Sequence, residues 1–213
     1  MNDPRQTIGW LLLVMVAVVG GGAAVLGVSQ APKDVPLQKA VNNTLAASNY
    51  SQVVTESTPQ GKQTDYLVFE APDKLGGYVE SGNKRTYVYV IGDTEYQSLT
   101  VSPTASTNHL VFYAQPSQGA TTVDPTHNYL RYAATAKNIT QTGSTYSFTL
   151  TQNGETGHFS YTVSGQYVSE FDLSVKTASV QLVISQVGSS PPVALPSGAK
   201  VVKAPTSPTS PTG

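Results

Sequence analysis

The chain has 213 residues, no cysteine and a formal net charge of −1 at neutral pH. A slightly acidic chain lacks the basic surface that nucleic-acid binding needs, so we expect no nucleic-acid partner. Without cysteine there are no disulfides, thiolate metal sites, cysteine nucleophiles or lipidated cysteine. Charged residues make up 12% of the chain, a low share that favours an exported protein rich in Ser and Thr.

The N-terminal region contains an uncharged apolar run over residues 8–28. About 20 apolar residues cross the hydrocarbon core of a bilayer, so this run predicts a single transmembrane helix. Residues 1–7 would then be a short cytoplasmic segment, residues 29–35 a linker, and the main domain would lie outside the cytoplasm of a cell membrane. The alternative is a signal peptide cleaved near residues 29–31, which would give a secreted protein.

A first helix is predicted over residues 36–48. Pro36 suits the first helical turn, where its missing N–H costs nothing. Leu37, Val41 and Leu45 recur every four residues and form one narrow apolar stripe. We expect a helix with one apolar stripe to pack that stripe against another element of the fold.

Most of the remaining chain predicts β-strands, because β-branched and aromatic residues alternate between Gly, Pro, Asn and Asp breakers. In 86–91, Tyr87 and Tyr89 fall on one face of the strand and Val88 and Val90 on the other. Asp124 predicts a helix N-cap, and Pro125 a first helical position, for a second helix over 125–137. The predicted strands are 50–56, 65–70, 77–80, 86–91, 95–101, 110–114, 145–151, 158–164, 167–175 and 180–186.

This order of elements predicts an α+β fold with one large antiparallel sheet of about ten strands and two covering helices. The domain would extend from 36 to 196. Residues 197–213 lack apolar periodicity and end in Thr/Ser/Pro repeats, which predicts a disordered tail.

Residues that could carry catalysis are scattered. His109, His127 and His158 have no partners at metal-site spacing, and no nucleophile elbow occurs. Asp93 and Glu95 belong to a predicted hairpin turn, where acidic residues are common. We therefore expect no catalytic residues, no metal site and no cofactor.

Two stretches, 67–74 (LVFEAPDK) and 90–96 (VIGDTEY), together with Val53–Val54 and Asp124–Pro125, resemble the LolA-like lipid carriers. The pattern is most similar to the LppX/LprG type of extracytoplasmic lipid-binding proteins of actinobacteria. The resemblance covers residues 36–196 and implies a curved half-barrel around an apolar cavity. It also implies a lipid or acylated ligand, a membrane as partner, and a further protein partner in the cell envelope.

The resemblance implies that the concave face is lined by Leu67, Phe69, Val88, Val90 and Phe112. The alternative is that these side chains fill a packed core and line no cavity. The family's corner motif corresponds to Pro72, Asp73 and Lys74; Lys74 stands where an Arg is usual and loses its bidentate geometry.

Three functions remain open from the sequence. The first is a membrane-anchored protein that binds acyl chains for carriage without catalysis. The second is an envelope sensor with a LolA-like domain. The third is a structural or adhesive surface domain with a solid core.

Overall fold

The computed structural model describes residues 36–152 and 154–204. The predicted anchor at 8–28, the linker at 29–35 and the last part of the predicted tail lie outside these residues. Among the residues that are described, no helix has both the length and the apolar character needed to cross a bilayer.

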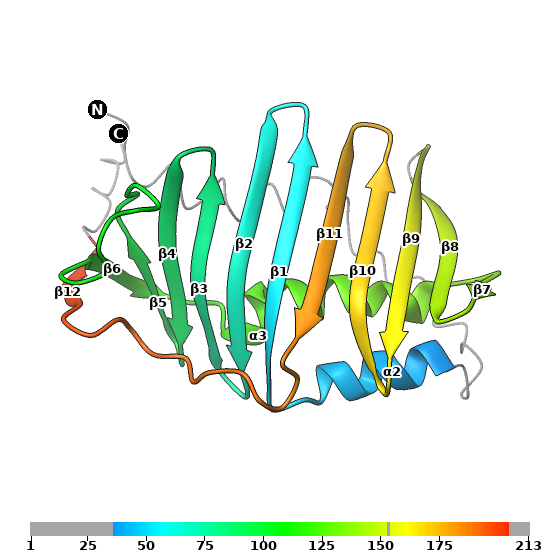
Figure 1. Cartoon of the computed structure of the whole chain (residues 1–213), viewed down its shortest axis with the longest axis horizontal. Coiled ribbons are helices and arrows are strands. Elements are labelled where there is room, and N and C mark those ends of the chain that lie inside the picture. Colours follow the sequence, from blue (N-terminus) through cyan, green and yellow to red (C-terminus); the bar gives the residue numbers. More distant parts are fainter. Residues whose placement is uncertain (1–35, 153, 205–213) are drawn as a thin grey trace, which may run out of the picture.

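One curved sheet of 12 strands dominates the molecule (Figure 1), in the order β12-β6-β5-β4-β3-β2-β1-β11-β10-β9-β8-β7. The sheet does not close, and its shape is consistent with a half-barrel. All neighbours pair antiparallel except β12, which runs parallel to β6 and makes the sheet mixed. The strands are β1 (Asn49–Thr58), β2 (Gly61–Glu70), β3 (Lys74–Ser81), β4 (Lys84–Ile91), β5 (Thr94–Ser98), β6 (Val111–Pro116), β7 (Thr140–Thr142), β8 (Thr145–Gln152), β9 (Glu155–Ser164), β10 (Tyr167–Val175), β11 (Ala178–Ser185) and β12 (Lys200–Lys203).

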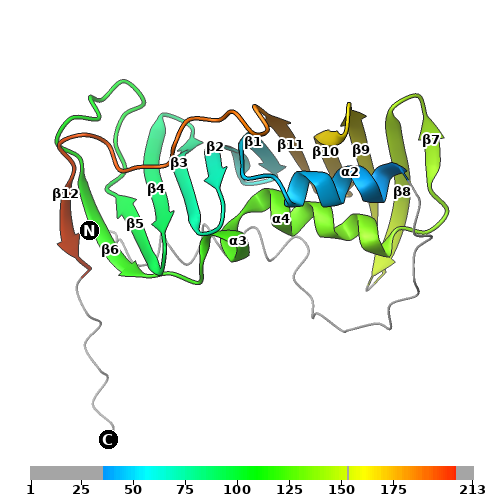
Figure 2. The same ribbon diagram turned by 90° about the horizontal axis from the view of Figure 1, so that it is seen from below.

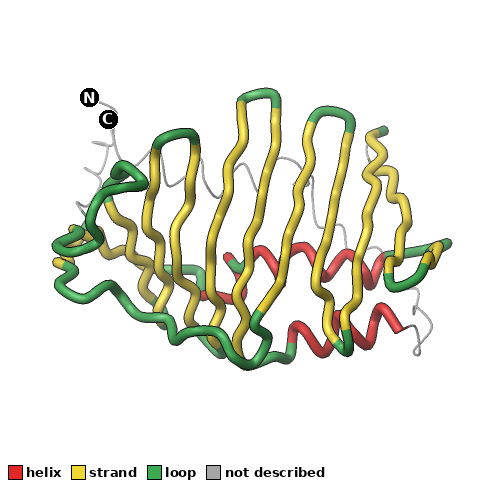
Figure 3. Tube along the Cα trace, in the orientation of Figure 1, coloured by secondary structure: helices red, strands yellow, loops and turns green. Residues whose placement is uncertain are grey.

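Short helices lie on the concave face of the sheet (Figure 2). They are α2 (Pro36–Leu45), α3 (Ala120–Val123) and α4 (Pro125–Leu130), and α4 continues as the 3-10 turn η1 (Arg131–Thr135). α2 packs against β9 and β10, α4 against β11, and α3 against β3. The tube in Figure 3 shows both helical runs on the same side of the strands.

The ten predicted strands correspond to β1–β6 and β8–β11, and the first helix is confirmed with an end three residues earlier than predicted. The second helix divides into α4 and η1. Three elements were not predicted: α3, β7 and β12. Strand β12 also corrects the predicted tail, because Lys200–Lys203 hydrogen-bonds to β6 and orders part of a segment we expected to be disordered.

Alternation along each strand creates the main core between sheet and helices. In β1, Tyr50, Gln52, Val54 and Glu56 are buried toward the helices, while the residues between them are partly exposed. Leu37 and Val41 of α2 and Leu130 of α4 join the same apolar cluster. The helical stripe predicted for 36–48 thus covers the concave face of the sheet.

A second, smaller apolar cluster lies on the opposite, convex face. Tyr87, Leu110 and Phe112 form its centre, and Leu195 and Ala199 pack against them. Leu195 and Ala199 belong to the return segment (residues 186–199), which joins β11 to β12 and runs along the lower ends of the strands in Figure 1. This segment therefore covers the convex cluster.

Candidate functional site

Four of the predicted lining residues share the concave face. Strand register places Leu67 opposite Gly77 and Gly77 opposite Val88, so Leu67 and Val88 lie on one face of the sheet. Phe69 and Val90 follow two residues along the same strands and lie on this face too. Leu67, Phe69 and Val90 are 7%, 1% and 1% exposed, whereas Val88 is half-buried.

Phe112 does not belong with these residues. It pairs with Ser98, and the register carries it to the face that holds Tyr87 and Tyr89, where it is fully buried in the convex cluster. The ring of Tyr89 meets Phe112 edge to face at 5.7 Å. The expectation that Phe112 lines the concave face therefore does not hold, because the β5–β6 pairing turns it outward.

The corner motif is an exposed turn between β2 and β3. Lys74 forms an ion pair with Glu70 at 2.7 Å, and the other Glu70 oxygen accepts a hydrogen bond from the backbone N–H of Val193 at 2.8 Å. The backbone carbonyl of Asp73 accepts from Gly92 N–H at 3.0 Å. These contacts tie the corner to the β4–β5 turn and to the return segment.

A buried polar network lies on the concave face beneath α4. Asp124, with no exposed surface, caps α4 by accepting from the backbone N–H of His127 at 2.9 Å. It also accepts from the hydroxyl of Tyr50 at 2.5 Å and from the side-chain amide of Gln52. The Gln52 carbonyl in turn accepts from the hydroxyl of Thr126 at 2.8 Å.

His127 completes this network. Its Nδ1 lies 2.6 Å from the Asp124 carboxylate, and its ring lies 5.0 Å from the ring of Phe69. Burial, followed by the charge of Asp124, raises the pKa of the Tyr50 hydroxyl far above its ordinary value, so Tyr50 stays a donor. The Asp124 N-cap was predicted, but its contacts with Tyr50 and Gln52 were not.

Two carboxyl groups are buried near one another on β1 and β2. Glu56 is 5% exposed and accepts from the hydroxyl of Tyr129 at 3.0 Å; Asp65 is 1% exposed and accepts from Gln63 at 3.0 Å. Burial, reinforced by the charge of Glu56, raises the pKa of Asp65 to about 7. Burial also raises the pKa of Glu56. No cationic group is paired with either carboxyl among the described residues.

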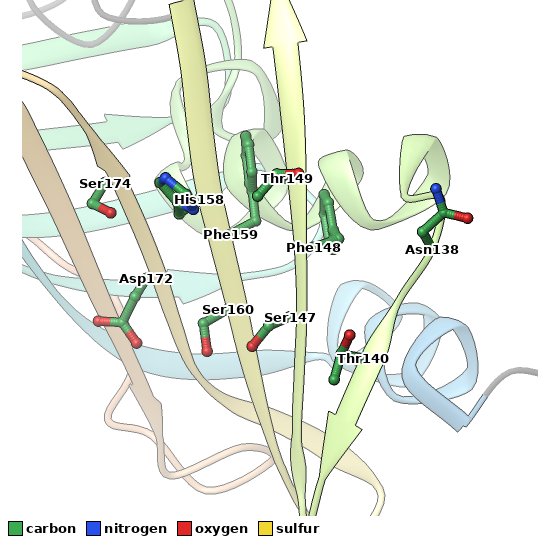
Figure 4. Close-up of a pocket in the computed structure, with 10 residues that line it drawn as sticks. All are labelled: Asn138, Thr140, Ser147, Phe148, Thr149, His158, Phe159, Ser160, Asp172 and Ser174. Atoms are coloured by element: carbon green, nitrogen blue, oxygen red, sulfur yellow. The ribbon is translucent and has the colours of Figure 1, made fainter.

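The convex face carries an open pocket of about 380 Å³ over β8–β10 (Figure 4). Hydroxyl and other polar side chains predominate in its lining, including Ser147, Ser160, His158 and Asp172. Phe148 and Phe159 also contribute to its lining. Within the described residues, no group of three His, Asp or Glu side chains is arranged to hold a metal ion.

The solved structures that this chain is similar to include two mycobacterial proteins. A crystal structure of the lipoprotein LppX from Mycobacterium tuberculosis matches with a TM-score of 0.49 and 10% identity, covering 76% of this chain and 96% of that one. A crystal structure of LprF from Mycobacterium bovis matches with a TM-score of 0.45 and 13% identity, covering 77% and 95%. LppX gives its name to the type that the sequence resembles.

These similarities assign no ligand to the chain. No protein-family model matches the sequence, and no curated protein matches it. The case for a function therefore rests on the geometry of the sheet and its two faces.

Proposed function

We propose that this chain is a non-catalytic extracytoplasmic protein that holds the acyl chains of a lipid or a lipidated ligand against the concave face of its sheet. The observation that supports this most is how unevenly the helices cover that face. Their main contacts are with β3, β9, β10 and β11. Val88 on β4 and Val111 and Tyr113 on β6 face the same side and remain half-buried.

Apolar side chains that are half-exposed on a curved sheet offer surface to an apolar ligand. An acyl chain laid along them would remove apolar area from water at about 25 cal/mol per Å². Each added CH₂ group would then contribute about 0.8 kcal/mol. Affinity should therefore rise with chain length until the uncovered part of the face is filled.

Attachment to a membrane is part of the same proposal. The apolar run at 8–28 has the length of a bilayer-spanning helix. An uncleaved span would keep the domain at the membrane surface, where it would receive or deliver lipid from a fixed position. Cleavage of the run would instead release a carrier able to leave the membrane.

The first experiment is mass spectrometry of organic extracts from residues 33–213, expressed in a host with a cell envelope. A lipid recovered at a defined stoichiometry supports the proposal. A folded protein that yields no lipid, and that shows no binding of an apolar fluorescent dye, contradicts it.

A pair of matched substitutions locates the bound ligand. Val88→Lys places a charge on the concave face, and Val183→Lys places the same charge on the convex face, where Val183 is already 40% exposed. We expect Val88→Lys to weaken dye and lipid binding at least tenfold and Val183→Lys to leave it unchanged. Equal effects of the two substitutions would place the ligand elsewhere.

A structural surface domain is the second candidate, and the burial of the core favours it. Leu67, Phe69 and Val90 have almost no exposed surface, so no ligand is needed to cover them. A solid core of this kind excludes apolar dye in its native state, whereas a lipid-binding face takes it up. Dye binding by the folded protein thus separates the two candidates.

A further inference from the structure

An exposed apolar patch lies in the middle of the convex face. Tyr66 on β2 is 37% exposed, and its ring stacks at 4.8 Å on the ring of Tyr78, its direct partner on β3. On the other side of Tyr66, Val53 is half-buried and Val183 is 40% exposed. The solvent face of an antiparallel sheet usually carries polar side chains. An apolar patch on this face therefore indicates a binding surface.

A second pair of tyrosines lies on the same face, nearer to the edge that β12 forms. Tyr89 of β4 and Tyr96 of β5 are direct partners, and both are half-buried. Gly76 is the partner of Tyr89 and lies two residues from Tyr78, which places all four tyrosines on one face. We call Tyr66 and Tyr78 the inner pair, and Tyr89 and Tyr96 the outer pair. The two pairs are two strands apart, about 10 Å, and are offset by two residues along the strands.

The sequence beyond the last described residue, Ala204, has a proline at every third position: Pro205, Pro208 and Pro211. Pro-rich sequences favour the polyproline II conformation, which has three residues per turn and rises about 3.1 Å per residue. All three prolines then lie on one face of the segment, about 9 Å apart. Segments of this kind bind to surfaces lined by aromatic side chains.

The chain leaves the sheet in the row of the outer pair. The backbone N–H of Ala204 donates to the carbonyl of Ala114 on β6 at 3.0 Å, and Ala114 is the direct partner of Tyr96. From β12, the outer pair lies two and three strands away, about 10 to 14 Å, and the inner pair four and five strands away, about 19 to 24 Å. In the polyproline II conformation, Pro208 would lie about 12 Å from Ala204, and Pro211 about 22 Å. The spacing of these two prolines therefore matches the two tyrosine pairs.

The charges of both partners are compatible with an apolar contact. The guanidinium of Arg85 lies 4.0 Å from the centre of the Tyr78 ring and is paired with Glu80. Residues 204–213 contain no charged side chain. Proline rings can therefore pack against the inner pair without leaving a charge unpaired.

We propose that residues 205–213 bind back onto the convex face of the same molecule, with Pro208 against the outer pair and Pro211 against the inner pair. Proline rings pack on tyrosine rings, and the preformed polyproline II conformation keeps the entropy cost of binding low. The bound segment covers the exposed ring of Tyr66. This inference goes beyond the proposed lipid-binding function, which uses the opposite face of the sheet.

The test is disulfide formation in the full chain, which has no cysteine of its own. Thr212→Cys directly follows Pro211, and Thr64→Cys lies two residues from Tyr66 on the same face of β2. With oxidised glutathione, we expect these two cysteines to form a disulfide within one chain. Replacing all three prolines with Ala keeps the length of the segment and should slow this disulfide about fivefold or more, because binding raises the effective concentration of the two thiols.

A distant cysteine and two substitutions on the convex face are the controls. Ser174→Cys is exposed on the same face of β10, about 38 Å from β12, whereas residues 205–213 extend about 28 Å. It should form no disulfide with Thr212→Cys. Tyr66→Thr should slow the reaction at Thr64→Cys as much as the loss of the prolines does. Val183→Thr removes a similarly exposed apolar side chain on β11, beyond the reach of the segment, and should leave the rate unchanged.

The outcomes separate the possible causes of a disulfide. An equal rate with and without the prolines shows random collision of the segment with the sheet and overturns the proposal. Disulfides that join two chains, and that increase with protein concentration, overturn binding within one molecule. The proline substitutions lie outside the sheet, so the comparison stands even if Tyr66→Thr does not fold. The result leaves lipid binding to its own experiment.

Discussion

Replacing Asp65 with Asn should make the protein more stable at neutral and alkaline pH. Asp65 is 1% exposed on the concave face of β2, and Glu56 is the charge that opposes its ionisation. Asn keeps the side-chain oxygen that accepts from Gln63 and removes the buried charge. The difference in stability between the two proteins therefore measures the free-energy cost of ionising one buried carboxyl group.

The magnitude follows from the raised pKa. An ordinary Asp has a pKa near 3.8, and in the folded protein the pKa of Asp65 is about 7. Between these values the folded protein retains a proton that the unfolded chain releases, so stability falls as pH rises from about 4 to about 7. Each pKa unit corresponds to about 1.4 kcal/mol, which gives a loss of about 4 kcal/mol by pH 8. The buried amide of Asn offsets part of this, so we expect a net gain of about 2–4 kcal/mol.

The assay is urea denaturation of wild-type and Asp65→Asn protein at pH 4, 6 and 8. The two proteins should differ by less than about 1 kcal/mol at pH 4 and by the full amount at pH 8. Glu56→Gln should show a smaller pH dependence than the wild type, because it removes the second cause of the raised pKa. Wild-type stability that increases between pH 4 and 8, or an Asn variant no more stable at pH 8, would refute the reasoning.

Two further substitutions test the backbone and the buried network. Gly77→Ala would place a Cβ 1.9 Å from the backbone oxygen of Tyr66, so we expect a loss of about 3 kcal/mol or more in denaturant unfolding. Gly61→Ala is the control, because its added Cβ meets no atom within 4 Å, and it should lower the free energy of unfolding by less than half as much. Equal losses in the two variants would show that the clash at Gly77 is not the cause. Asp124→Ala removes an N-cap and leaves Tyr50 and Gln52 without their acceptor, which should cost about 3–5 kcal/mol. The exposed Asp93→Ala is its control and should change stability by less than about 1 kcal/mol; a similar loss in both would show that the network contributes little.

The strands were predictable because their signal is local. In β4, the alternation of Tyr87 and Tyr89 with Val88 and Val90 gives two faces at a period of two residues, and the structure confirms the strand. The helix α3 has four residues, including Thr121, Thr122 and Val123. β-branched residues favour strands, and a single turn is too short for a periodic pattern.

The misplacement of Phe112 has a different cause. Alternation separates the two faces of one strand but does not say which face matches that of the neighbouring strand. That match depends on register, and β5 and β6 are joined by a long loop over residues 99–110. Phe112 could therefore not be assigned to a face from its own strand.

The buried network was hidden by sequence distance. The N-cap at Asp124 follows from the adjacent Pro125 and is confirmed. Tyr50 and Gln52 lie 74 and 72 positions away on β1, and only the fold brings them to the helix. The strand β12 was missed for the same reason, because its four residues gain order from pairing with β6.

The parallel strand β12 has a consequence for the edge of the sheet. Without it, β6 would present an unpaired row of N–H and C=O groups, a template for intermolecular strand pairing. β12 occupies that row with only four residues and has a lysine at each end, Lys200 and Lys203. Short length and charge both discourage a further strand from joining. We therefore expect a protein shortened to the predicted border at 196 to expose β6 and to self-associate more readily than the full chain.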